Sequence, residues 1–131
     1  MYTLNFDGGS TGNPGVAGAG AVIYLNGEEL WAGSMYVGSM ETNNTAEYCG
    51  LILGLEEAIR QNISILKVYG DSLLVINQVT GKYKVNAPHL KVLYDRVMEL
   101  IGYFDKITFG HVLRHLNKRA DQLSNIGRKN K

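Results

Sequence analysis

Apolar and polar side chains alternate in residues 2–7, with the period of two that is typical of a β-strand, and two more strand-like runs follow. Between the second and third runs, Asn26-Gly27 is a strong signal for a two-residue hairpin turn. The Gly-rich stretch from Gly8 to Gly20 is predicted to be a loop. The alternating segment and the two strand-like runs predict three strands, over residues 2–7, 19–25 and 29–37. The chain is therefore expected to open with an antiparallel meander.

After residue 41 the apolar spacing becomes helical. Thr42-Asn43-Asn44 offers capping side chains, and residues 46–61 are apolar nearly all round, which predicts a buried helix. A short apolar strand is expected over residues 65–69, followed by a helix from Leu73 to Val79 that Ser72 can cap.

The last third of the chain is predicted to hold two more helices and a strand. Pro88 suits the first turn of a helix in which Leu90, Leu93, Val97 and Leu100 recur at helical spacing. A strand is expected over residues 106–111. Asn117 is expected to cap a final helix that begins near Lys118. A meander followed by βαβ units predicts an α/β fold with a mixed sheet flanked by helices.

Composition narrows the class of protein. The 131 residues are 45% hydrophobic and 19% charged, with a net charge of +1, as in a soluble single-domain protein. No apolar run is long enough to cross a membrane, and the N-terminus has no secretory pattern. Cys49 is the only cysteine, so no internal disulfide is possible. We therefore expect a cytoplasmic protein.

Positive charge gathers in two places. Lys82, Lys84 and Lys91 lie close together in sequence, and residues 128–131 carry three positive charges. Such clusters fit a local nucleic-acid-binding patch. They fit solvated surface lysines equally well.

Four acidic residues hold positions where strands end or helices begin. Asp7 is expected to end the first strand and Asp71 the fourth, while Glu47 and Asp121 lie near the starts of the first and last helices. If strands one and four are adjacent and parallel, both aspartates lie where open sheets bind ligands. Taken singly, each acid also fits a turn or a helix N-terminus.

Convergence of these acids would have a chemical consequence. Carboxylates packed together repel one another and need a neutralising partner. Ligand sets made only of oxygen suit Mg²⁺ or Mn²⁺, and no Cys/His spacing indicates zinc.

Four sequence blocks each contain one of the acids, and they extend over nearly the whole chain. They are DGGSTGNPG at 7–15, TNNTAEYCGLILGLEEA at 42–58, YGDSLLVINQVTGKYKV at 69–85 and HVLRHLNKRADQLSN at 111–125. Together they resemble the type 1 ribonuclease H family. The resemblance implies a five-stranded mixed sheet with helices on both sides. It also implies cleavage of the RNA strand of RNA–DNA hybrids, leaving 5′-phosphate and 3′-hydroxyl ends.

The resemblance also implies roles for residues. Two ions, Mg²⁺ or Mn²⁺, would be held by Asp7, Glu47, Asp71 and Asp121. The catalytic domain would cover residues 1–127, and residues 128–131 would be a short basic tail. Substrate-binding residues are expected at Gly8, Gly9, Ser10, Asn13, Asn43, Asn44, Ser72, Arg114 and Asn117. Gly, Asn and Ser are also the ordinary residues of turns and helix caps, so a purely structural role stays open for them.

His111 resembles a mobile-loop histidine that assists proton transfer or product release, and is expected to be catalytic. It directly follows a predicted strand, so a structural role is the alternative. Arg114 is the other candidate for this role, in which it would contact a phosphate. His89 and His115 are read as surface residues.

The sequence departs from the family pattern in two places. A basic, Trp-containing protrusion is replaced by the short segment GKYKV, and Leu73 stands where the family often has Gln. The only tryptophan, Trp31, is expected in a strand and in the core. We expect the tail at 128–131, or Lys82 and Lys84, to compensate in part for the missing phosphate contacts.

The partner implied is an RNA–DNA hybrid, bound by a monomer. The main alternative is a catalytically idle nucleic-acid-binding module on the same fold. A second alternative is a related phosphoryl-transfer enzyme that cuts DNA, such as a resolvase or an integrase-like protein.

Overall fold

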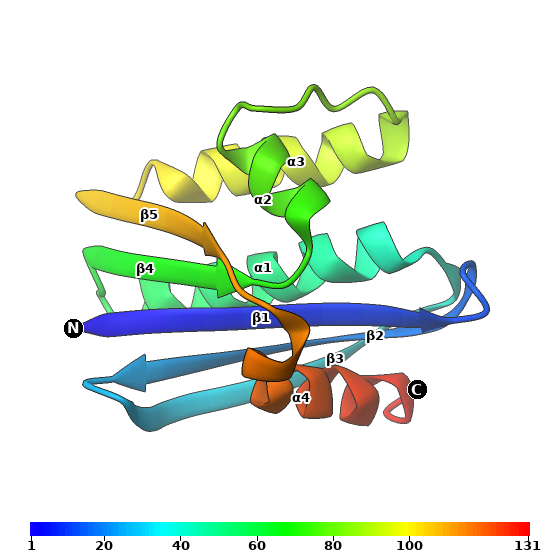
Figure 1. Ribbon diagram of the computed structural model, residues 1–131, viewed down its shortest axis with the longest axis horizontal. Coiled ribbons are helices and arrows are strands. Elements are labelled where there is room, and N and C mark those ends of the chain that lie inside the picture. The colour runs from blue at the N-terminus through cyan, green and yellow to red at the C-terminus, as the bar shows by residue number, and fades with distance from the viewer.

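The computed structural model describes all residues, 1–131, and shows one five-stranded mixed sheet with helices on both faces (Figure 1). The elements follow in the order β1 (Tyr2–Thr11), β2 (Gly15–Leu25), β3 (Glu28–Glu41), α1 (Asn43–Arg60), β4 (Ile65–Gly70), α2 (Leu73–Val79), α3 (Pro88–Ile101), β5 (Lys106–His111), a 3-10 turn η1 (Arg114–Leu116) and α4 (Lys118–Arg128). This confirms the predicted α/β class and element order.

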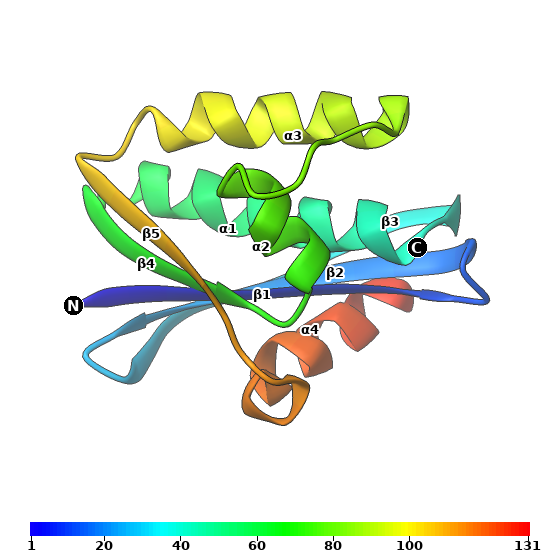
Figure 2. The same cartoon turned by 45° about the horizontal axis from the view of Figure 1, so that its top comes forward.

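The first strand lies at the centre of the sheet, whose order is β3-β2-β1-β4-β5. β1 and β2, and β2 and β3, pair antiparallel, whereas β1 and β4, and β4 and β5, pair parallel. Helices α1, α2 and α3 cover one face, and α4 lies on the other (Figure 2). The winding direction therefore changes beside β1, where such sheets bind ligands.

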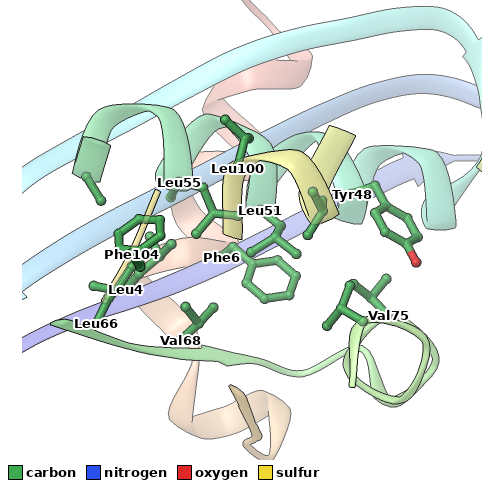
Figure 3. Close-up of a cluster of buried hydrophobic side chains, with 14 of the residues drawn as sticks. Leu4, Phe6, Tyr48, Leu51, Leu55, Leu66, Val68, Val75, Leu100 and Phe104 are labelled. Carbon is green, nitrogen blue, oxygen red and sulfur yellow. The ribbon is translucent and has the colours of Figure 1, made fainter. Parts of the chain in front are cut away.

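The main core lies between the sheet and α1. Its fully buried side chains come from alternate positions of the strands and from one side of the helix (Figure 3). They include Leu4, Phe6, Val68, Leu51 and Leu55. Trp31 is only partly buried and packs against the edge of this cluster. None of the helices is both long and apolar enough to cross a bilayer.

The expectation that Gly8 to Gly20 forms a loop is wrong. β1 and β2 pair continuously as far as Thr11 and Val16, and only residues 12–14 form the turn. Several of these glycines are places where a helix lies against the sheet: a Cβ on Gly20 would come within 2.5 Å of Leu123 in α4. Glycine in a strand interior can therefore indicate close packing instead of a turn.

Three of the predicted helix starts are confirmed and one cap is wrong. The hydroxyls of Thr42 and Ser72 cap α1 and α2, accepting from the amides three residues on, and Pro88 opens α3. Asn117 stands at the N-cap position of α4, but its side chain makes no capping hydrogen bond. It is 2% exposed, and its amide is used elsewhere.

Candidate active site

Asp7 and Asp71 are neighbours because their strands are neighbours. β4 pairs in parallel with β1, and the register places Gly70 opposite Phe6. Asp7 directly follows Phe6, and Asp71 directly follows Gly70. Asp71 follows the end of β4 as predicted, whereas Asp7 does not end its strand, because β1 continues to Thr11.

Glu47 reaches the same place because α1 lies unusually close to β1. A Cβ on Gly8 would come within 2.1 Å of the Ala46 carbonyl carbon, and one on Gly50 within 2.4 Å of the Asp7 carbonyl oxygen. With glycine on both surfaces, the helix backbone rests on the strand. One carboxylate oxygen each from Asp7, Glu47 and Asp71 then lies within 4.8 Å of the others.

Asp121 approaches from the opposite face of the sheet. It lies in the first turn of α4, as predicted, and lines the same pocket as the other three acids. The start of α4 is fixed by Asn117, whose Nδ2 donates to the Phe6 carbonyl at 2.9 Å and whose Oδ1 accepts from Asn5 at 3.0 Å. Asp121 is not part of the tight group of three acids.

Burial and mutual repulsion raise the pKa of two carboxyl groups of the cluster. Burial, reinforced by the charge of Asp71, raises the pKa of Asp7 from 3.8 to about 7. Burial and then the charges of Asp7 and Asp71 raise the pKa of Glu47 well above its usual value. Glu47 Oε1 is buried without a hydrogen-bond partner. An oxygen-rich, buried and mutually repelling set of this kind fits hard divalent cations.

The four acids share one pocket of about 550 Å³, and none of the residues that line it is hydrophobic. Apart from the acids, the lining residues are Gly8, Gly9, Ser10, Asn43, Arg114, Ser124, Asn125 and Arg128. The pocket therefore joins the acidic cluster to a polar, partly basic surface.

Three predicted substrate-binding residues are hydrogen-bonded together at one edge of this pocket, which Ser10 and Asn43 line and Asn13 does not. The Ser10 amide donates to Asn43 Oδ1 at 2.7 Å, and the Asn43 amide donates to Asn13 Oδ1 at 2.9 Å. The β1–β2 turn and the start of α1 are thus tied together. Ser10 Oγ is buried without a partner.

Other predicted residues lie outside the pocket lining. Asn44 and Ser72 do not line it, and the Ser72 hydroxyl is used as the α2 cap. Asn117 lies beneath the site, with its amide committed to β1. Leu73 is half exposed at the first turn of α2.

His111 and Arg114 occupy different positions. His111 is the exposed last residue of β5, and its Nε2 lies 3.2 Å from the Asp71 carbonyl oxygen, so it stands beside the site without lining it. Arg114 is exposed and lines the pocket. His89 and His115 are exposed, as expected.

Three lining residues were not predicted as part of the site: Ser124, Asn125 and, as a pocket residue, Arg128. They follow Asp121 by three, four and seven positions on α4, the spacing of one helix face. That spacing was the available signal. The other proposed basic residues, Lys82 and Lys84, are exposed in the loop after α2 and do not line the pocket.

Comparison with known proteins shows which family has this sequence and fold. The family described as "Reverse transcriptase-like" matches residues 5–127. A bifunctional protein of Mycobacterium tuberculosis is 42% identical over 123 residues, which are 93% of this chain and 34% of that protein. A ribonuclease H of Pseudomonas fluorescens is 33% identical over 92% of this chain and 86% of its own length. The chain thus spans about a third of the mycobacterial relative and most of the pseudomonad one.

Solved structures agree with the sequence comparisons. RNase H1 from the archaeon Halobacterium salinarum superimposes with a TM-score of 0.94 at 37% identity, covering 99% of this chain and 98% of that chain. LC11-RNase H1, solved in complex with RNA/DNA hybrid, gives 0.91 at 34% identity, covering 98% and 97%. From its sequence, its sheet topology and these likenesses, the chain belongs to the reverse transcriptase-like, ribonuclease H family.

Proposed function

We propose that this protein is an endonuclease that hydrolyses the RNA strand of RNA–DNA hybrids and leaves 5′-phosphate and 3′-hydroxyl ends. The observation that carries the proposal is the convergence of Asp7, Glu47, Asp71 and Asp121, from four separate elements, in one pocket without hydrophobic lining. The ribonuclease H names of its relatives, and the hybrid-bound neighbour, support the substrate class.

The four acids are proposed to hold two divalent cations, Mg²⁺ or Mn²⁺. Their oxygen-only donor set and the unpartnered Glu47 Oε1 fit such ions. When bound, the ions would supply activation of a water and neutralisation of charge at the leaving 3′ oxygen. The carboxylates must be ionised to bind them, so binding releases the protons that Asp7 and Glu47 hold at low pH.

The remaining residues are proposed to position the hybrid. Gly8 and Gly9 line the pocket, and their backbone is proposed to contact the substrate. Asn43, whose side chain accepts from the Ser10 amide, is proposed to contact the wide, shallow groove in which 2′-hydroxyls distinguish RNA from DNA. His111, next to Asp71, is proposed to transfer protons or assist product release.

The test is cleavage of an end-labelled hybrid in Mg²⁺ or Mn²⁺, beside single-stranded RNA, double-stranded RNA and duplex DNA of the same sequence. Cuts confined to the RNA of the hybrid support the proposal, and end analysis gives the product chemistry. Binding without cleavage would favour the idle module, and cleavage of duplex DNA would favour a resolvase-like enzyme.

Two variants make this test specific. Asp71→Asn removes one charge from the cluster and is expected to abolish cleavage. Asp105→Asn removes the same charge from the exposed residue just before β5, at the opposite end of that strand from His111, and is expected to cleave as the unmodified protein does. Equal activities of the two variants would contradict the assignment of the cluster as the active site.

A further inference from the structure

The five arginines of the chain fall into two groups. Arg60, Arg96 and Arg119 each pair with a glutamate. Arg114 and Arg128 form no ion pair, although both line the pocket that holds four carboxylates. An arginine held near acids without binding them keeps its guanidinium free for an external anion.

The guanidinium of Arg128 is directed toward the pocket by its neighbours. Arg128 is the half-buried last residue of α4, and its Nη2 donates to Asn125 Oδ1, one turn earlier. Side chains of a helix lean toward its N-terminus, which here is the end that carries Asp121. Nη1 lies over β1, 3.3 Å from the place of a Cβ on Gly9. The guanidinium therefore lies against β1 at Gly9, where the absence of a Cβ leaves space for it.

A simpler interpretation is that Arg128 answers the dipole at the C-terminal end of α4, where positive side chains are stabilising. Its contacts argue against that as its main role. The only hydrogen bond of its guanidinium is to Asn125, and none is to a carbonyl of the last turn. Lys129 and Lys131, which follow it, are exposed.

We propose that Arg128 binds a phosphate of the RNA strand adjacent to the phosphate that is cut. The inference rests on the proposed function, which places the scissile phosphate at the four acids. The two strands of a hybrid stand apart across a wide groove, so a pocket of about 550 Å³ receives one of them. Neighbouring phosphates of one strand can then meet the acids and Arg128 together.

The first test compares Arg128→Ala and Arg128→Lys with Lys106→Ala, a matched loss of charge at an exposed residue that begins β5 and does not line the pocket. A charge-assisted hydrogen bond to phosphate predicts that Arg128→Ala raises KM roughly tenfold, with kcat changed less than about twofold. The KM of Arg128→Lys should lie between those of the unmodified protein and Arg128→Ala, because lysine keeps the charge but lacks the forked donors of a guanidinium. Lys106→Ala should change KM less than about twofold. Equal effects of the two alanine variants would overturn the inference.

The second test locates the contact. A neutral methylphosphonate is moved one linkage at a time along the RNA strand. The unmodified protein should lose affinity roughly tenfold at one linkage beside the cut, and Arg128→Ala should lose nothing further at that linkage. If Arg128→Ala is as sensitive as the unmodified protein at every linkage, the inference fails.

These outcomes separate the two proposals. If the unmodified protein does not cut the hybrid, the proposed function fails and the inference with it. If it cuts and Arg128→Ala matches it in KM and in the linkage scan, only the role of Arg128 fails. Thermal melts followed by circular dichroism check that each variant is folded, and Arg128→Lys keeps the test decisive if the alanine variant is not.

Discussion

At the scale of single residues, the acids and Asn117 show how far side-chain identity predicts position. The four carboxylates could be predicted because each stands in a recognisable block, and the structure places all four in one pocket. Asn117 was expected to cap α4 and instead bonds to β1. An asparagine before a helix looks the same in the sequence whether it caps that helix or bonds to a distant strand.

The raised pKa of Asp7 predicts that the metal-free protein is less stable at neutral pH than at pH 4. Asp7 titrates near 3.8 when unperturbed and at about 7 in the folded chain. Between these values the folded state holds the extra proton, so the free energy of unfolding falls as pH rises and levels off above about pH 7. At about 1.4 kcal/mol per pKa unit, the total is at most about 4 kcal/mol. Denaturant melts in EDTA across this range measure it.

Asp7→Asn supplies the control for that prediction. The amide does not ionise, so the decline in stability between pH 4 and pH 7 should become shallower while the protein stays folded. Cleavage should be abolished. A slope equal to that of the unmodified protein would show that other groups cause the pH dependence, and loss of folding would point to a structural role for Asp7.

Asn117→Ala should lower the free energy of unfolding by about 2 kcal/mol, because the Phe6 carbonyl loses its side-chain donor inside the protein. Urea unfolding measures the change. Asn130→Ala, which alters an exposed residue just after α4, should cost less than about 0.5 kcal/mol. Similar losses of stability in the two variants would show that the hydrogen bonds from Asn117 to β1 do not stabilise the protein.

At the scale of elements, the strands and helices were predicted better than the contacts between them. Periodicity indicated nearly every element, and the Asn26-Gly27 hairpin is present between β2 and β3. The prediction of a loop at the glycines of β1 and β2 is wrong, because the sequence does not distinguish a glycine needed for a turn from one needed for close packing. Which it is depends on α1 and α4, which come from distant parts of the chain.

Gly8 and Gly9 allow this packing to be tested with neighbouring residues. A Cβ on Gly8 would overlap the backbone of α1 at Ala46, whereas one on Gly9 would meet only the flexible end of Arg128. Gly8→Ala should therefore destabilise the protein by about 3 kcal/mol or more. Gly9→Ala should cost less than about 1 kcal/mol. Thermal or urea unfolding compares them, and equal costs would show that the close approach of α1 is not rigid.

At the scale of the whole molecule, the site exists only when the sheet and both helix layers are assembled. The fold class could be predicted from the order of elements and the family resemblance. The pocket could be predicted only in part, because Ser124, Asn125 and Arg128 enter it through the angle at which α4 crosses the sheet. A crossing angle follows from packing across both layers, which no local pattern records.

Divalent cations should stabilise the assembled protein. A cation that binds only the folded state adds about 1.4 kcal/mol at ten times its Kd, which raises Tm by several degrees. Because the ligands must lose protons, the rise in Tm with Mn²⁺ should be larger at pH 8 than at pH 5.5. Scanning fluorimetry measures both. Asp71→Asn should abolish most of the rise, and an unchanged rise would place the cation elsewhere.

The position of β1 has a consequence for synthesis. Of the five strands, β1 is made first and is the central strand of the sheet, and α4, which is made after all five, brings the fourth carboxylate. Proteins grow from the N-terminus at a few residues per second. A nascent chain on the ribosome thus holds no more than three of the four acids until α4 has emerged, so the complete acidic pocket forms only after every strand of the sheet has been made.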